Sequence, residues 1–140
     1  MIMSTGGINL KKVIVLLILF LLTLTSCSSI VNYSTEAIEI NSVNTNVNKW
    51  VGNNSKTDGI YLGKTKESDK VVMYYLYVNY SCKVISIDSG GKDSIIIDAI
   101  PRQSGKKSDV IFCIIVKDTS FKKFILNGED IKASAVSVIK

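Results

Sequence analysis

The chain has 140 residues, three cysteines, one proline and no histidine, and its formal net charge is +5. Two of the seventeen lysines and arginines precede residue 27 and all twelve acids follow it, so residues 27–140 carry a net charge of about +3. That charge is too small to indicate nucleic acid as a partner. The lack of histidine excludes Ser-His-Asp and Cys-His nucleophilic sites and removes the commonest nitrogen ligand of zinc.

Residues 1–27 have the three parts of an export signal in the usual order. Lys11-Lys12 precedes the apolar run Val13–Leu22, and Leu24-Thr25-Ser26-Cys27 follows it. Positive charges stay on the cytoplasmic side while the apolar run enters the membrane, and small residues suit a cleavage enzyme with a narrow pocket. The arrangement resembles the signal peptide and lipobox of bacterial lipoproteins. The resemblance implies that Cys27 receives a diacylglycerol and becomes the N-terminus once residues 1–26 are removed.

Cys27 would therefore anchor the protein in the cell membrane, facing outside the cytoplasm, or in the outer membrane of an organism that has one. Two alternatives remain open. The first is an uncleaved membrane helix, although Val13–Leu24 has only twelve residues and a span needs about 20. The second is ordinary secretion, with Cys27 free or in a disulfide.

Removal of the signal leaves 114 residues, enough for one domain and too few for two. We expect a lipidated N-terminus and polar tether over residues 27–54, because Ser28–Asn54 is rich in asparagine, serine and threonine. Within it, Thr35–Ile40 is a candidate first strand and Lys49–Lys56 a candidate helix.

Residues 55–140 are predicted to form a β-rich domain. Gly90-Gly91 and Asn127-Gly128 are hairpin signals, and the continuous apolar run of Asp109–Val116 indicates a strand buried on both faces. The predicted strands are Gly59–Lys64, Lys70–Asn79, Ser81–Asp88, Ser94–Ile100, Asp109–Val116, Phe121–Leu126 and Ile131–Ile139. About seven short strands favour an all-β fold, a small single-domain sandwich or barrel. The helix near Lys49–Lys56 would make it α+β instead.

If Cys27 carries lipid, Cys82 and Cys113 remain as an even pair in an oxidising compartment. A disulfide between them would stabilise the fold by roughly 3–4 kcal/mol in the chain-entropy model. The alternative is that both are buried thiols acting as small apolar residues.

Catalysis has little support in the sequence. The two cysteines do not form a C-x-x-C pair, and the glycine pair lies between two predicted strands rather than at a helix terminus. Two carboxylates would suffice for a glycosidase, but no pair is singled out. The candidates are Glu36, Glu39, Glu67, Asp69, Asp88, Asp93, Asp98, Asp109 and Asp118. We expect no enzyme, no cofactor and no metal site; the turn around Asp88 and Asp93 lacks the spacing of a calcium loop.

The best candidates for a binding surface are aromatic and basic. Tyr75 and Tyr77 share one face of a predicted strand, and an outward aromatic face would suit sugar stacking or protein contact. Arg102, Lys106 and Lys107 form a basic loop further along the chain. Both features also have an ordinary structural explanation, as strand-forming tyrosines and solubilising loop charges.

The sequence thus predicts a lipid-anchored protein with a non-catalytic β-domain that binds a protein or a cell-envelope component. An inhibitor or immunity-type lipoprotein acting against a toxin or hydrolase is the main alternative. An envelope glycan hydrolase using paired carboxylates is a third reading. The expected partners are membrane lipid at Cys27 and an unknown envelope protein or glycan.

Overall fold

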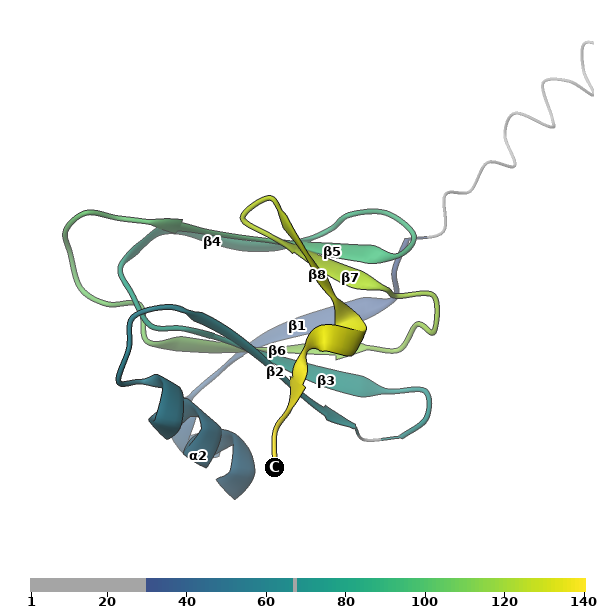
Figure 1. Cartoon of the computed structure of the whole chain (residues 1–140), viewed down its shortest axis with the longest axis horizontal. Helices are drawn as coiled ribbons and strands as arrows, with labels where there is room; N and C mark the ends of the chain where they lie inside the picture. The colour runs from purple at the N-terminus through teal and green to yellow at the C-terminus, as the bar shows by residue number, and fades with distance from the viewer. Residues whose placement is uncertain (1–29, 67) are drawn as a thin grey trace, which may run out of the picture.

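The computed structural model describes residues 30–66 and 68–140, which form two β-sheets packed face to face with one α-helix outside them (Figure 1). The first sheet has the strand order β1-β6-β3-β2-β9 and the second has the order β4-β5-β7-β8. The elements are β1 (Tyr33–Ile38), η1 (Ile40–Ser42), α2 (Thr45–Asn54), β2 (Ile60–Lys66), β3 (Val72–Val78), β4 (Cys82–Ser89), β5 (Ser94–Pro101), β6 (Val110–Val116), β7 (Lys123–Leu126), β8 (Glu129–Lys132), η2 (Ala133–Ala135) and β9 (Ser137–Val138). This confirms the predicted small β-sandwich and adds the short helix of the α+β alternative.

The core between the sheets comes from alternate residues of the central strands. Tyr74, Leu76 and Val78 point inward from β3, and Ile95 and Ile97 point inward from β5. This alternation follows from the two-residue period of a strand. An edge-to-face contact at 4.9 Å between the rings of Tyr74 and Phe124 of β7 joins the two sheets.

Strand β6 lies inside the first sheet, where it pairs with β1 on one side and β3 on the other. Ile114 and Val116 pack between the sheets, whereas Ile111 and Cys113 pack on the opposite face. The expectation of a strand buried on both faces is therefore confirmed.

Helix α2 covers the outer face of the first sheet. Asn44 caps it by accepting a hydrogen bond of 2.9 Å from the backbone N–H of Val47. Val47 and Val51, one turn apart, are both fully buried against the strands. No helix within the described ranges is long and apolar enough to cross a membrane.

The polar tether predicted over residues 27–54 is wrong from Val31 onward, while residues 27–29 lie outside the described residues. Strand β1 pairs with β6 along its whole length, and α2 belongs to the same folded unit. The segment is polar overall but still folds, because its few apolar side chains face the sheet and its asparagines lie mostly on the exposed side.

The predicted final strand Ile131–Ile139 divides into two. Asn127 and Gly128 have φ angles of 49° and 86° and form the expected hairpin turn between β7 and β8. The chain then passes through η2 to the other sheet, where β9 pairs in parallel with β2. Gly63 of β2 lets Ile139 pack closely, since an added Cβ there would lie 2.7 Å from the Ile139 side chain.

Cys82 and Cys113 are not joined by a disulfide. Cys82 lies beside the core between the sheets, and Cys113 lies in the cluster under α2. Since the first sheet separates these two environments, a disulfide would require a rearranged backbone. The candidate bridge is thus contradicted, and the alternative of two thiols is what the structure shows.

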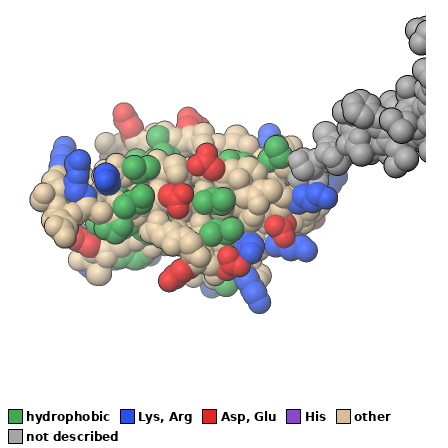
Figure 2. Space-filling view, turned by 90° about the horizontal axis from the view of Figure 1, so that it is seen from above, with side chains coloured by type: hydrophobic (Ala, Val, Ile, Leu, Met, Phe, Trp, Pro, Cys, Tyr) green, Lys and Arg blue, Asp and Glu red, His purple; other side chains and the backbone are tan. Residues whose placement is uncertain are grey.

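The loops gather at two opposite ends of the sandwich (Figure 1). At the proximal end, where the described chain begins at Ile30, are the turns 68–71, 89–93 and 117–122. At the distal end are the loops 55–59, 79–81 and 102–109. Figure 2 looks onto the face made by the second sheet: lysine and arginine side chains lie at both ends of this face, with acidic and apolar side chains between them.

Candidate functional site

The distal end is held together by backbone hydrogen bonds between its three loops. The N–H of Asn79 donates to the carbonyl of Gly59 at 2.9 Å, which joins the end of β3 to the loop that follows α2. The N–H groups of Arg102 and Ser108 donate to the carbonyls of Ser81 and Tyr80 at 2.8 and 3.0 Å. The basic loop 102–109 is therefore fixed at both its ends.

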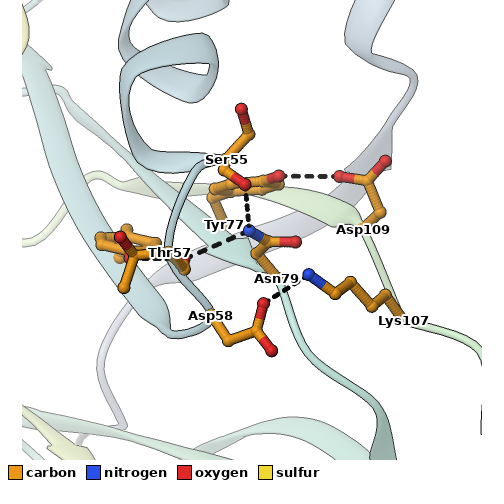
Figure 3. Close-up of polar contacts among 8 residues, drawn as sticks. Ser55, Thr57, Asp58, Tyr77, Asn79, Lys107 and Asp109 are labelled. Atoms are coloured by element: carbon orange, nitrogen blue, oxygen red, sulfur yellow. Dashed lines mark hydrogen bonds and ion pairs between the residues drawn. The ribbon is translucent and has the colours of Figure 1, made fainter.

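The side chain of Asn79 fixes the loop between α2 and β2. Its amide donates to the carbonyls of Ser55 and Thr57 at 2.8 and 3.2 Å (Figure 3). Asn79 is only 4% exposed, so these bonds satisfy donors that would otherwise be buried without partners. Tyr61 donates from its hydroxyl to the same Thr57 carbonyl at 2.7 Å.

Tyr77 connects the cluster under α2 to the basic loop. Its ring lies 6.1 Å from that of Tyr61, and its hydroxyl donates to Oδ1 of Asp109 at 2.8 Å (Figure 3). Burial raises the pKa of Tyr77 well above its ordinary value, and the hydrogen bond to the Asp109 carboxylate raises it further. Asp109 has a φ of 41°, a left-handed conformation that aspartate tolerates better than most residues.

The charged side chains of the basic loop are accessible. Lys107 pairs with Asp58 at 2.5 Å, but the two side chains are 56% and 60% exposed, so water and salt screen the pair. Arg102 and Lys106 are exposed as well. These cations are thus available to an incoming partner.

A shallow, open hollow of about 470 Å³ lies beside this loop. Ile60, Tyr80 and Pro101 give it apolar walls, and Asp58 and Arg102 add one charge of each sign. The hydroxyl of Tyr80 donates to the carbonyl of Ala99 at 2.6 Å, and burial raises the pKa of Tyr80. An apolar hollow with charged residues around it suits an amphipathic segment of a partner.

The structure corrects the predicted tyrosine surface. Tyr75 and Tyr77 share the outer face of β3 as expected, but they are only 6% and 1% exposed because α2 covers them. They contribute to the distal end through packing and through the Tyr77 hydroxyl, not as exposed rings. Of the predicted interaction residues, the structure leaves Arg102, Lys106 and Lys107 accessible, while Cys27 lies outside the described residues.

The candidate carboxylates are dispersed over the fold, and Glu67 lies outside the described residues. Asp109 is bound to Tyr77, and Asp118 accepts hydrogen bonds from Ser120 and Asn32 that lower its pKa. Across residues 30–66 and 68–140, no three acidic, cysteine or histidine side chains are grouped closely enough to hold a metal ion.

Sequence reasoning missed Asn79 as a residue of this end. A usable signal was present in the sequence, because Asn79 is the polar residue that ends the apolar and aromatic run Val71–Val78. Its partners are backbone carbonyls 22 and 24 positions earlier in the chain. No periodicity in the sequence identifies such partners.

The described chain is thus a two-layered β-sandwich with one helix-covered sheet and a structured basic loop at its distal end. No protein-family model matches the chain, and neither a curated protein nor a solved structure shows significant similarity to it. Its function is therefore inferred from the residues of this chain alone.

Proposed function

We propose that this protein is a lipid-anchored binding protein whose distal end captures a protein or a component of the cell envelope. The anchor is Cys27, on the strength of its resemblance to a lipobox. The observation that carries the binding role is geometric: the basic loop and its hollow lie at the end of the sandwich opposite to the one where the described chain begins, at Ile30. Ile30 follows Cys27 by three positions in the sequence. An anchored domain would thereby have the distal end free for a partner.

The chemistry of the distal end favours an acidic, partly apolar partner. Arg102, Lys106 and Lys107 offer charge, and the hollow offers apolar area beside them. Such a surface gains association rate and selectivity from its charge and affinity from apolar burial. An immunity-type role would use the same surface, with an incoming toxin or hydrolase as the acidic partner.

The test compares two triple variants with the same change in charge. Arg102→Gln, Lys106→Gln and Lys107→Gln remove three exposed cations from the distal end, and Lys49→Gln, Lys132→Gln and Lys140→Gln remove three exposed cations elsewhere. A photo-crosslinker at exposed Gln103 in the full chain, expressed in a bacterial envelope, identifies the captured component.

An exposed ion pair contributes roughly 0.2–1 kcal/mol, so the loss of three should lower the affinity for the captured component about threefold to a hundredfold. The affinity of the control variant should stay near the original. Equal capture by both variants would contradict the proposed surface. Cleavage of an envelope glycan by the purified protein would contradict the non-catalytic role.

A further inference from the structure

The beginning of the described chain is attached to the proximal end of the sandwich. Val31 is 3% exposed, and its N–H donates to the carbonyl of Gly91 at 3.0 Å. Asn32 accepts at its carbonyl from the N–H of Lys117 at 3.1 Å, and the N–H of Asn32 donates to Oδ2 of Asp118 at 3.3 Å. The folded domain is therefore fixed from Val31 onward, directly beside the turns 89–93 and 117–122.

Only Ser28 and Ser29 separate Cys27 from Ile30 in the sequence. An extended chain covers at most about 3.6 Å per residue, so three steps from Cys27 reach Ile30 within roughly 11 Å. That upper limit is comparable to the Debye length, which is about 8 Å at physiological salt and about 10 Å at 0.1 M. A lipid at Cys27 would hold the proximal end within electrostatic reach of the lipid headgroups.

Exposed cations surround this attachment point. Lys92, Lys117 and Lys122 belong to segments that are hydrogen-bonded to one another or to Val31 and Asn32. Lys70, from the turn between β2 and β3, lines a hollow together with residues of the 117–122 turn. In Figure 2 blue side chains gather where the grey trace leaves the domain.

Four described acids, Asp69, Asp88, Asp93 and Asp118, lie at this end beside the four lysines, so the charges balance by count. The lysines would therefore act through the placement and reach of their ammonium groups and not through an excess of charge. Asp118 directs its carboxylate toward Ser120 and the N–H of Asn32. Asp93 is half-buried, and its backbone carbonyl accepts from the backbone N–H groups of Lys122 and Lys123. Asp69 is exposed, in the same turn as Lys70. The flexible ammonium groups reach farther from the surface than these short carboxylates. Ile30, 62% exposed, adds an apolar side chain at the same place.

We infer that the proximal end is a membrane-contact surface, on which Lys70, Lys92, Lys117 and Lys122 bind anionic lipid headgroups and hold the distal end away from the bilayer. The inference rests on the proposed lipid at Cys27. A lysine close to an anionic leaflet raises the affinity for the membrane about fivefold. Because the link from Cys27 to Ile30 is short, the four lysines would orient the domain on the membrane as well as hold it there.

The experiment uses the lipidated full chain in vesicles of phosphatidylglycerol with phosphatidylcholine, and in vesicles of phosphatidylcholine alone. Fluorescent probes are placed at Thr119→Cys on the proximal end or at Gln103→Cys on the distal end, in a Cys82→Ser background. Spin-labelled headgroups report proximity by quenching, and the mass of the peptide that begins at Cys27 reports the anchor.

Quenching at Thr119 should exceed that at Gln103 several-fold in the anionic vesicles and should fall in high salt. It should also fall in the variant Lys70→Gln, Lys92→Gln, Lys117→Gln, Lys122→Gln. The matched variant Lys49→Gln, Lys56→Gln, Lys83→Gln, Lys140→Gln should leave it unchanged. Thermal unfolding of both variants verifies that the fold is kept.

Lipid on Cys27 with equal quenching at the two probes would overturn the membrane-contact surface and leave the anchor standing. Quenching at Thr119 that is the same with and without the anionic lipid, and the same in the four-lysine variant, would also overturn the membrane-contact surface and leave the anchor standing. A Cys27 peptide without lipid would overturn the anchor, and the membrane-contact surface with it.

Discussion

Asn79 lies where the end of β3 meets the loop after α2, and its amide binds two carbonyls of that loop. Because these partners come from distant positions, the sequence indicates only a polar residue after a buried strand. Tyr77 is similar: its strand position was predicted, but its bond to Asp109 depends on how the loop 102–109 returns to β6. For single residues, the sequence therefore indicates the kind of residue at each place but not its hydrogen-bond partner.

Replacing Asn79 with alanine should destabilise the fold by about 1–3 kcal/mol, because the carbonyls of Ser55 and Thr57 lose their donor. Asn79→Asp should cost at least as much, since it keeps the size but sets an acceptor against those carbonyls. Denaturant unfolding measures both changes. The exposed Asn53→Ala on α2 serves as control and should change stability by less than about 0.5 kcal/mol.

Tyr77 should make the fold sensitive to alkali. Its pKa is raised in the folded state, whereas in the unfolded chain it stays near the ordinary value of about 10. The stabilisation is therefore complete below pH about 10 and is lost as the pH rises above that value. Tyr77→Phe should flatten this loss, as followed by denaturant unfolding at a series of alkaline pH values. A stability that falls equally steeply in Tyr77→Phe would exclude Tyr77 as a source.

Helix α2 is the element that changes the interpretation of the sequence most. Its stretch was predicted mainly as tether because asparagines surround its few apolar residues, and the candidate helix was placed four residues late, at Lys49–Lys56 instead of Thr45–Asn54. The strand it covers carried the missing signal. Apolar residues on both faces of β3 indicate two covered faces, as they do on β6.

Two neighbouring residues of α2 should respond in opposite directions to alanine. Val51 is fully buried against the sheet, and Val51→Ala should destabilise the fold by about 2 kcal/mol. Gly52 is exposed with no atom near its absent Cβ, and Gly52→Ala should stabilise the fold by roughly 0.5–1 kcal/mol through helix propensity. Thermal or denaturant unfolding of the two variants measures both effects. Equal effects would mean that α2 is not packed as described.

At the scale of the whole molecule, the strands and hairpins were predictable and their layering was not. Alternation and glycine turns indicate where strands run, but the parallel pairing of β9 with β2 depends on contacts distant in sequence. The same holds for the division of basic residues between two ends. Arg102–Lys107 was visible as one basic segment, whereas Lys70, Lys92, Lys117 and Lys122 come together only in the folded chain.

The two ends of the domain would have different roles in the proposed protein. The proximal end, with the proposed lipid and the lysines, would face the membrane, and the distal end, with the basic loop and its hollow, would face a partner. This arrangement depends on the proposed lipid at Cys27, because that lipid is what would attach the proximal end to the membrane. Its removal should therefore affect location and leave folding intact. Cys27→Ser should leave an uncleaved precursor or release the protein from the membrane fraction, with unchanged thermal unfolding of the released domain.

The most direct measurement is the mass of the protein extracted from the membranes of bacterial cells that produce it. We expect a chain that begins at Cys27 and carries acyl groups on that residue. A chain that retains residues 1–26, or one whose Cys27 is unmodified, would contradict the proposed lipid anchor.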